Sequence, residues 1–436
     1  MPRLSRKIRW PFALLFAWFV FPAVSARPGQ YTKTDREFAQ EMLKSVAADV
    51  QKHYYDIKLH GVDWDTKVRE AKKNIDAADS LNSAVSEIAA LLDNLNDSHT
   101  VFYPPPRTTT QDYGFKMEMI GDHCFVTYVS AGSEAEKKGL KVGDEVLAVN
   151  DHPASRKNLW RIHYLYSVLR PQPGLRLTLA DATGHPRQLE VMARIRQILY
   201  KSPNERSRDR DDMHHSLRAR YFERGDDLLV VKFPEFAFSA AEADSILGHM
   251  RKHKGVVLDL RGNPGGFADT LDRLLGGIFQ YDPKIYDRVG RDSTKPVVAT
   301  GLHHDAFTGK FAVLIDSKSA SASEVFARVV QLEKRGLVVG DRSAGMVMEA
   351  RFYRHQTAVD TQAFFGAFIT EADLVMADGK SLEHVGVAAD IVILPTARDL
   401  ANKRDPVLAK AAAMVGGELS PEEAGTAFPY EEPNVE

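Results

Sequence analysis

The spacing of hydrophobic and polar positions changes along the chain, and each change predicts a different kind of domain. Residues 31–95 carry apolar side chains at helical spacing, whereas residues 112–195 alternate apolar and polar positions over short stretches between turns. From residue 228 onward, short apolar runs alternate with amphipathic runs. Because this spacing is the primary sequence signal for secondary structure, we expect a helical segment, a β-rich domain and an α/β domain.

The borders of these regions are marked by breakers and charged stretches. Three consecutive prolines end at Pro106, and the mixed-charge stretch 204–212 has no apolar period, which is typical of a solvated linker. Residues 420–436 are rich in Pro and Glu and predict a mobile tail. The boundaries we expect are a helical domain at 27–106, a β-rich domain at 107–197, a charged linker at 198–225, an α/β core at 226–416 and a flexible tail at 417–436.

The first 26 residues have the pattern of a secretory signal peptide. Positions 1–9 contain four basic residues and no acidic residue, and positions 11–23 are almost wholly apolar. Val24-Ser25-Ala26 then offers a small-residue cleavage site. This order predicts cleavage after Ala26 and an exported protein, periplasmic or secreted. An uncleaved membrane anchor is the alternative, although the apolar run is short for a span.

Composition narrows the classes of partner and chemistry. Hydrophobic residues make up 44% and charged residues 27%, as in soluble globular proteins. Loss of the four basic residues of the signal would take the formal charge from −2 to −6, so neither nucleic acid nor an anionic membrane is an expected partner. The only cysteine, Cys124, lies in an apolar strand pattern and is interpreted as a core residue, so no intrachain disulfide is expected.

The segment 311–331 predicts a strand, a turn of small residues and a helix that begins near Ala322. Ser321 would lie at the N-terminus of that helix, where backbone N–H groups lack internal partners and the helix dipole is positive. A hydroxyl there can attack a carbonyl, and the resulting oxyanion meets donors. The alternative is an ordinary serine N-cap.

A second turn in the same domain supports the first interpretation. The predicted buried strand 256–260 runs into Arg261-Gly262-Asn263-Pro264 and then Gly265 and Gly266. Paired glycines after a strand let backbone N–H groups approach a ligand closely. A Pro-Gly-Gly sequence alone is usually only a turn.

The stretch 132–150 resembles the core of a PDZ domain, which assigns residues 107–197 to that fold. Tyr113 and the four residues after it lie where PDZ domains keep their carboxylate-binding loop, which predicts peptide binding by Gly114, Phe115, Lys116 and Met117. In such domains a peptide C-terminus meets backbone N–H groups while the peptide adds a strand. The alternative is a PDZ-shaped lid that binds no tail.

Together, the Leu-Arg-Gly-Asn-Pro-Gly-Gly turn, the Ser-Ala-Ser-Ala-Ser-Glu turn, the PDZ-like module and the N-terminal helices resemble the tail-specific, or C-terminal-processing, serine peptidases over residues 31–415. The resemblance implies an α/β (α+β multidomain) protein with a crotonase/Clp-protease-like catalytic core, an N-terminal helical segment and an inserted PDZ domain. It also implies Ser321 as the nucleophile. The oxyanion hole would then be formed by the N–H of Ala322 with that of Gly265 or Gly266.

The general base departs from the Ser–Lys branch of that family. Met346 occupies the position of the lysine, and a thioether is no useful proton acceptor. A sister branch that includes the tricorn protease uses a Ser-His pair before the PDZ module and a glutamate near the end of the core. The matching residues here are Ser98, His99 and Glu383.

These residue types form a coherent set, because histidine is suited to proton transfer near neutral pH and a carboxylate can fix its tautomer. Ser98 is expected to add a hydrogen bond. The alternatives are a capped loop around His99, a surface role for Glu383 beside its rival His384, and Lys318 as a fallback base.

The sequence therefore predicts an exported serine endopeptidase that acts on flexible protein or peptide tails through an acyl-enzyme. No cofactor or metal is expected, since the adjacent pairs at His214-His215 and His303-His304 lack metal-ligand spacing and are interpreted as solvated loop residues. One alternative is a catalytically silent, PDZ-bearing peptide- or ligand-binding protein. Another is a crotonase-like acyl-CoA enzyme, which the signal peptide and the PDZ module disfavour.

Overall fold

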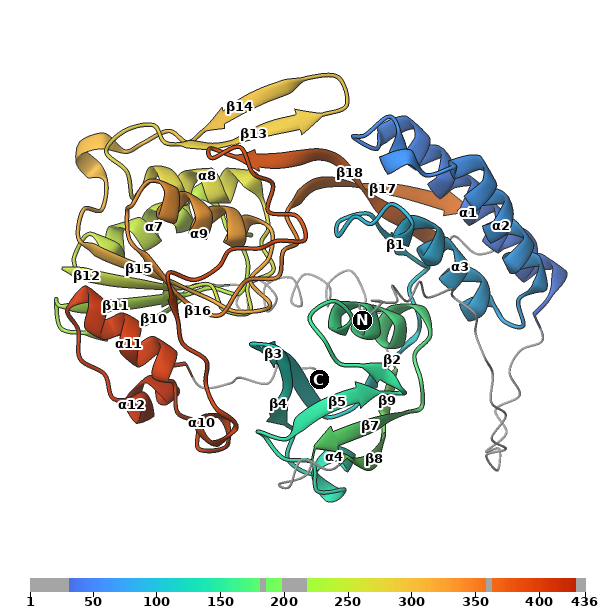
Figure 1. Cartoon of the computed structure of the whole chain (residues 1–436), viewed down its shortest axis with the longest axis horizontal. Coiled ribbons are helices and arrows are strands. Elements are labelled where there is room, and N and C mark those ends of the chain that lie inside the picture. The colour runs from blue at the N-terminus through green and yellow to red at the C-terminus, as the bar shows by residue number, and fades with distance from the viewer. Residues whose placement is uncertain (1–30, 181–185, 198–217, 358–362, 429–436) are drawn as a thin grey trace, which may run out of the picture.

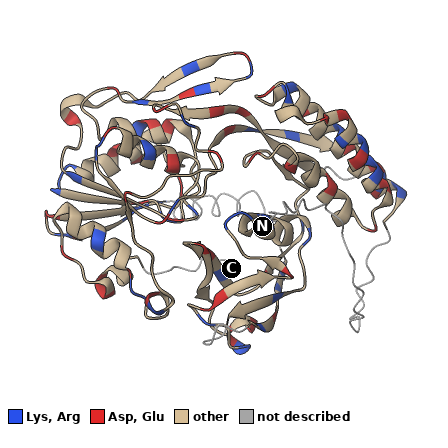
Figure 2. Ribbon diagram, viewed as in Figure 1, with Lys and Arg blue, Asp and Glu red and all other residues tan. Residues whose placement is uncertain are grey.

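A computed structural model describes residues 31–180, 186–197, 218–357 and 363–428. The N-terminal helices, the PDZ domain and the α/β core are separate parts of the chain, and two long strands run from the core to the helices (Figure 1). Acidic and basic residues are interspersed over the drawn elements, in keeping with the balanced composition (Figure 2). The predicted signal peptide lies outside the described residues. No helix within the described residues is long and apolar enough to cross a membrane.

Three helices form the N-terminal segment, as their apolar spacing predicts: α1 (Lys33–His53), α2 (Trp64–Ala77) and α3 (Leu81–Asp93), with the short η1 (Leu59–Gly61) between the first two. The side chains of Thr32, Asp63 and Ser80 accept hydrogen bonds from the N3 backbone and so fix where each helix begins. The apolar faces of the helices pack on a β-sheet through Phe365, Ala367 and Ile369.

That sheet joins the N-terminal segment to the core. It contains β1 (Val101–Tyr103), β13 (Lys284–Gly290), β14 (Thr294–Val298), β17 (Met348–Thr357) and β18 (Ala363–Met376). β18 pairs antiparallel with β17 along one edge, and with β1 and then β13 along the other. Residues 101–103, expected in the helical domain, are therefore a strand of a sheet built mainly from core residues.

The PDZ domain is confirmed as a β-rich fold. Its elements are β2 (Thr109–Asp112), β3 (Phe115–Ile120), β4 (His123–Val129), α4 (Glu134–Lys137), β5 (Glu145–Val149), β6 (His152–Pro153), α5 (Leu159–Tyr164), η2 (Leu165–Leu169), β7 (Gly174–Ala180), β8 (Pro186–Met192) and β9 (Arg194–Gln197). The main sheet has the order β3-β4-β5-β7-β8, so β3 is an edge strand, and β2 pairs with β9. Cys124 is buried in β4, as expected of a core residue, and burial raises the pKa of its thiol to about 12.

The α/β core has a sheet of order β10-β11-β12-β15-β16-β19, parallel from β11 onward. These strands are β10 (Arg220–Arg224), β11 (Leu228–Lys232), β12 (Gly255–Asp259), β15 (Lys310–Ile315), β16 (Leu337–Gly340) and β19 (Ile391–Val392). Alternate residues of β11 face opposite sides: Leu229 and Val231 pack with one group of helices, Leu228 and Val230 with another. The first group contains α7 (Ala240–Met250), α8 (Ala268–Gly276) and α9 (Ala322–Leu332). The second group includes α11 (Pro406–Val415) and α12 (Pro421–Thr426). The core also contains the short helices α10 (Ala397–Ala401) and η3 (His303–Asp305).

Two expected boundaries differ from the structure. The end of the predicted linker forms β10, whose five residues all pair with β11. The start of the predicted tail contains α12, which is fixed by burial of Leu419 and Ala424 against the core. Both segments are polar in composition, yet a few apolar contacts and strand pairing order them.

Candidate active site

The turn before α9 presents Ser321 at the carboxyl end of β15, the edge where open parallel sheets carry ligands. Asp316 Oδ1 shapes this turn by accepting the N–H groups of Gly262, Lys318 and Ser319 at 2.9–3.0 Å. Ser321 itself has φ 52° and ψ −119°, a conformation that costs energy for a residue with a side chain. An ordinary N-cap residue is extended, so this geometry argues against the simple N-cap interpretation.

His99 lies against the serine. Its Nε2 is 3.3 Å from Ser321 Oγ, and its Nδ1 is 2.8 Å from Ser98 Oγ. Ser98 Oγ also donates to Glu383 Oε2 at 2.8 Å. Glu383 thus reaches the imidazole through the Ser98 hydroxyl, and four groups from three distant segments form one hydrogen-bonded chain.

The direction of this chain follows from the carboxylate at its end. Ionised Glu383 can only accept, so Ser98 donates to it and accepts from the Nδ1–H of His99. His99 Nε2 is then unprotonated and faces the Ser321 hydroxyl. Burial raises the pKa of Glu383, and this shift is opposed by hydrogen bonds from the N–H groups of Val347 and Ser98 at 2.9 and 2.8 Å.

Asp97, which the sequence reasoning did not single out, holds the backbone of the histidine. Its Oδ1 accepts the N–H groups of His99 and Thr100 at 2.8 and 3.0 Å, and its Oδ2 accepts the Tyr54 hydroxyl at 2.9 Å. Burial lowers the pKa of His99, and the negative charge of Asp97 opposes that shift. The imidazole is therefore neutral near pH 7, as a proton acceptor must be.

The glycine turn lies directly beside the serine. Gly265 has φ 103°, and a Cβ placed on it would lie 2.7 Å from Ser321 Cβ and 2.9 Å from Ala322 N, so only glycine fits. The Gly265 N–H donates to Asn263 Oδ1 at 2.9 Å. Within the part of the chain that the structure describes, the N–H groups of Ala322 and Gly266 have no intramolecular acceptor.

Comparison of the sequence with protein-family models finds two matches. Residues 227–393 match the sequence model described as "Peptidase family S41", and residues 105–159 match that of the PDZ domain. The α/β core is thus similar in sequence to peptidase family S41. The S41 domain contains Ser321, Glu383 and the glycine turn, whereas Ser98 and His99 come from the segment before the PDZ domain.

Curated relatives share the family over much of the chain. A tail-specific protease of Haemophilus influenzae is 25% identical over 68% of this chain and 43% of its own length. A chloroplastic C-terminal processing peptidase of Tetradesmus obliquus is 25% identical over 85% of this chain and 80% of its own length. The chain thus spans less than half of the first relative and most of the second.

Solved structures share the fold. Mature CPAF is 14% identical with a TM-score of 0.64, covering 85% of this chain and 95% of its own. The photosystem II D1 C-terminal processing protease is 18% identical with a TM-score of 0.51, covering 83% of this chain and 97% of its own. The expected fold class, an α/β catalytic core with an N-terminal helical segment and an inserted PDZ domain, is confirmed.

Met346 stands where the Ser–Lys branch carries its general-base lysine, and it contacts the serine turn through its backbone. The Met346 N–H donates to Glu324 Oε2 at 2.9 Å, and its carbonyl accepts the Ser321 N–H at 2.8 Å. Lys318 has its ammonium 2.9 Å from Glu118 Oε2. Burial lowers the pKa of Lys318, but the Glu118 carboxylate outweighs it and holds that pKa above its usual value, so the amine stays protonated.

His384 does not lie where it could replace His99 as the base. Its Nε2 lies 2.8 Å from the carbonyl oxygen of Asn96 and 3.4 Å from Glu383 Oε1, and its ring is half-exposed. No contact between His384 and Ser321 is found among the described residues. His384 therefore flanks the outer side of Glu383.

Glu324 is the second site residue that the sequence reasoning missed. It is fully buried, and its carboxylate accepts four hydrogen bonds, from the N–H groups of Ser321, Gly345 and Met346 and from the Ser343 hydroxyl. Burial raises its pKa to about 7 against the opposing effect of these bonds. The sequence signal that could have identified Glu324 is an acidic residue on an otherwise apolar face of the predicted helix.

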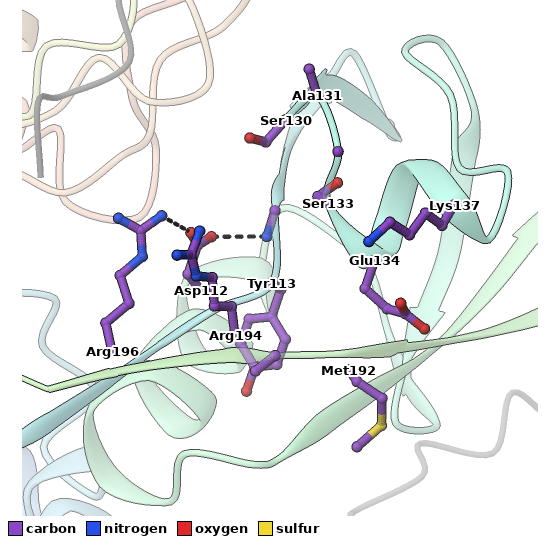
Figure 3. A pocket seen from close by; sticks show the side chains of 13 residues that line it. Asp112, Tyr113, Ser130, Ala131, Ser133, Glu134, Lys137, Met192, Arg194 and Arg196 are labelled. Atoms are coloured by element: carbon purple, nitrogen blue, oxygen red, sulfur yellow. Dashed lines mark hydrogen bonds and ion pairs between the residues drawn. The ribbon is translucent and has the colours of Figure 1, made fainter.

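The predicted carboxylate-binding loop of the PDZ domain leads into the edge strand β3. Gly114 has φ 71°, and its N–H donates to Asp112 Oδ1 at 2.9 Å; Phe115, Lys116 and Met117 continue into the edge strand β3. A cavity of about 340 Å³ borders the loop (Figure 3), lined by Ser130, Lys137, Met192, Arg194, Arg196 and neighbouring residues. Arg196 Nη2 binds Asp112 Oδ2 at 2.7 Å, so Asp112 links the loop to the cavity wall.

One of the two histidine pairs lies within the described residues. His303 and His304 are exposed in η3, as expected of solvated residues, and His214 and His215 lie outside the described residues. Among the residues that the structure describes, no group of three or more His, Cys, Asp or Glu side chains could hold a metal ion.

Proposed function

We propose that this protein is an exported serine endopeptidase that cleaves protein or peptide substrates, near their C-terminal tails, through an acyl-enzyme on Ser321. The observation that carries the proposal is the separation of 3.3 Å between Ser321 Oγ and His99 Nε2. It is supported by the hydrogen bond that orients the other ring nitrogen, because a nucleophile, a base and an orienting group in hydrogen-bond reach define an activated serine.

In the proposed mechanism, His99 Nε2 takes the proton of Ser321 as the oxygen attacks the scissile carbonyl carbon. The carbonyl oxygen becomes an oxyanion and accepts hydrogen bonds from the N–H groups of Ala322 and Gly266. We favour Gly266 over Gly265, since the Gly265 N–H already donates to Asn263. His99 then gives its proton to the leaving amine, and water repeats the sequence on the acyl-enzyme to release the acid.

Ser98 and Glu383 act on the imidazolium that forms in each half of this cycle. The positive ring donates from Nδ1 to Ser98, which passes the interaction to the Glu383 carboxylate. A buried negative charge one hydroxyl away stabilises the ring in the charged state and fixes its tautomer in the neutral one. In this proposal Glu383 orients and stabilises the imidazole of His99, and Ser98 connects the two groups.

The relatives and the PDZ domain support the proposed substrate class. The relatives are named as tail-specific and C-terminal processing proteases, and the PDZ domain has an edge strand, β3, of the kind to which an extended peptide can add. Recruitment of tails through Gly114, Phe115, Lys116 and Met117 is part of the proposal. Export rests on the predicted signal peptide at 1–26, with cleavage after Ala26 tested by N-terminal sequencing of the exported protein.

The deciding experiment compares wild type with Ser321→Ala on an unfolded protein substrate and with a fluorophosphonate probe. We expect hydrolysis and probe labelling to be lost in the variant, with labelling of wild type mapped to Ser321 by mass spectrometry. Unchanged thermal unfolding of the variant is the control for folding. Hydrolysis by Ser321→Ala would refute the assignment, and an unlabelled, inactive wild type would favour the silent binding protein that the loss of the lysine suggests.

A further inference from the structure

Three aromatic side chains form an exposed cluster on the sheet that joins the N-terminal helices to the core. Tyr103, Phe352 and Phe368 come from β1, β17 and β18 and are 42%, 40% and 37% exposed. Their ring centroids lie 5.1–6.0 Å apart in tilted or edge-to-face arrangements. We call these three residues the aromatic face. Large apolar side chains left together at the surface commonly mark a binding site.

The strand register explains why these side chains share one side of the sheet. Phe352 of β17 pairs with Phe368 of β18, and Tyr103 of β1 pairs with Gly366, which lies two positions before Phe368 and therefore on the same side of the sheet. The opposite side is already covered, because Phe365, Ala367 and Ile369 pack against the N-terminal helices. The aromatic face is thus the side that those helices leave uncovered.

Gly366 makes room for the cluster. A Cβ on this residue would lie 2.6 Å from Phe352 Cζ, so the ring of Phe352 rests on the backbone of its neighbouring strand. Gly366 also pairs with Tyr103. A larger residue there would push the Phe352 ring away from its partners, so the flat aromatic surface depends on this glycine.

Both outer strands of the aromatic face start at the catalytic residues. β1 begins at Val101, two positions after His99. β17 begins at Met348, directly after Val347, whose N–H binds Glu383. Since a strand rises about 3.3 Å per residue, Val101 and Tyr103 lie roughly 7 and 13 Å along the chain from His99. An extended substrate covers these distances with two to four residues.

We propose that the aromatic face binds an apolar side chain of the substrate polypeptide, two to four residues from the scissile bond. The inference rests on the proposed peptidase function and names a specificity determinant for it. Continuity with Ser321 and His99 argues for substrate as the occupant. The uncharged rings give no compensation for burial of a charged side chain, so the face selects apolar over acidic residues.

The test uses peptides that contain one cleavage site and carry leucine or aspartate at each position from two to four residues on either side. Binding to the Ser321→Ala protein is measured by fluorescence anisotropy, and kcat/KM is measured on active enzyme. We expect leucine to be preferred at one of these positions. The double variant Phe352→Ala/Phe368→Ala should lose this preference and fall about tenfold or more in affinity and kcat/KM for the leucine peptide.

Matched variants separate binding from folding. Tyr281→Ala removes an aromatic side chain that is 49% exposed elsewhere on the core and should leave the preference unchanged. Phe352→Leu should restore part of the preference, since it keeps an apolar surface. Fluorophosphonate labelling of Ser321 should be equal in all of these proteins.

Two outcomes would overturn the inference. One is an unchanged leucine preference in the double variant that still labels at Ser321. The other is loss of self-association by the double variant in sedimentation, with its preference intact, which would assign the face to a second copy of the chain. If wild type fails to label, the proposed function fails, while the anisotropy measurement still decides whether the face binds apolar peptide.

Discussion

The carboxylate of Glu324 accepts a hydrogen bond at 3.1 Å from the backbone N–H of Ser321, the residue three positions before it. The same carboxylate binds the N–H groups of Gly345 and Met346 at 2.8 and 2.9 Å. One buried acid therefore ties the turn of Ser321 to the irregular segment that leads into β17. The strained backbone of Ser321 persists because its surroundings hold it from both sides.

The first prediction concerns the pH dependence of stability conferred by Glu324. Its pKa is raised from 4.5 to about 7, so the folded state keeps a proton there that the unfolded state loses. Wild type should therefore lose stability relative to Glu324→Gln as the pH rises from about 4.5 to 7, by about 3 kcal/mol in the free energy of unfolding. Urea unfolding of both proteins at the two pH values measures this change, and a constant difference would contradict it.

The second prediction concerns the acid limb of the pH–rate profile. Because burial lowers the pKa of His99 and Asp97 opposes that shift, kcat/KM should fall with a midpoint below 6.5 as the pH drops and the imidazole becomes protonated. Asp97→Asn should move the midpoint to still lower pH, since it removes the opposing negative charge. The amide can keep accepting the N–H groups of His99 and Thr100. A midpoint above 6.5, or a shift upward in the variant, would count against His99 as the base.

The third prediction separates the proton acceptor from its supporting groups. His99→Ala should lower kcat by about a thousandfold, whereas Met346→Ala should leave it nearly unchanged. Ser98→Ala should cost about tenfold to a hundredfold, because it removes one hydrogen bond to a group that becomes charged. Steady-state kinetics on one peptide measures all three variants. A greater loss from Met346→Ala than from His99→Ala would mean that the base is misassigned.

The sequence was most informative where chemistry and local structure coincide. The turns that carry Ser321 and Gly265 consist of small residues after apolar strands, and such turns can be recognised without knowledge of tertiary contacts. His99 and Glu383 required the family resemblance, because they lie 284 positions apart and the contact between their segments is made only by folding. Asp97 did carry a local signal, because an aspartate often accepts the backbone N–H two positions on, as Asp97 does from His99.

Long-range strand pairing explains the boundaries that the sequence did not give. β1 is too short to be recognised from its own pattern, and it becomes a strand because β18, more than 250 positions later, supplies its partner. β10 is likewise made by its pairing with β11. The aromatic face could not be foreseen for the same reason, since its three residues meet only through this register.

The last prediction concerns an ion-pair cluster beneath the glycine turn. Arg261 forks between the carboxylates of Asp259 and Asp405, with four hydrogen bonds of 2.7–3.0 Å, and Lys232 adds one more to Asp259. Burial alone would raise the pKa of the fully buried Asp259, but these two cations hold it well below its usual range. Arg261→Met leaves two carboxylates with too little positive charge and should cost about 3–5 kcal/mol of unfolding free energy.

A surface pair of similar geometry provides the control. Arg224 Nη2 lies 2.7 Å from Glu423 Oε1, but both side chains are about half exposed. Arg224→Met should therefore cost much less than Arg261→Met, because water screens that pair. Arg261→Lys should fall between the two, since it keeps the charge and loses the planar fork that Asp259 and Asp405 share. Equal losses for Arg261→Met and Arg224→Met in denaturant titrations would show that burial of Asp259 does not govern the strength of the cluster.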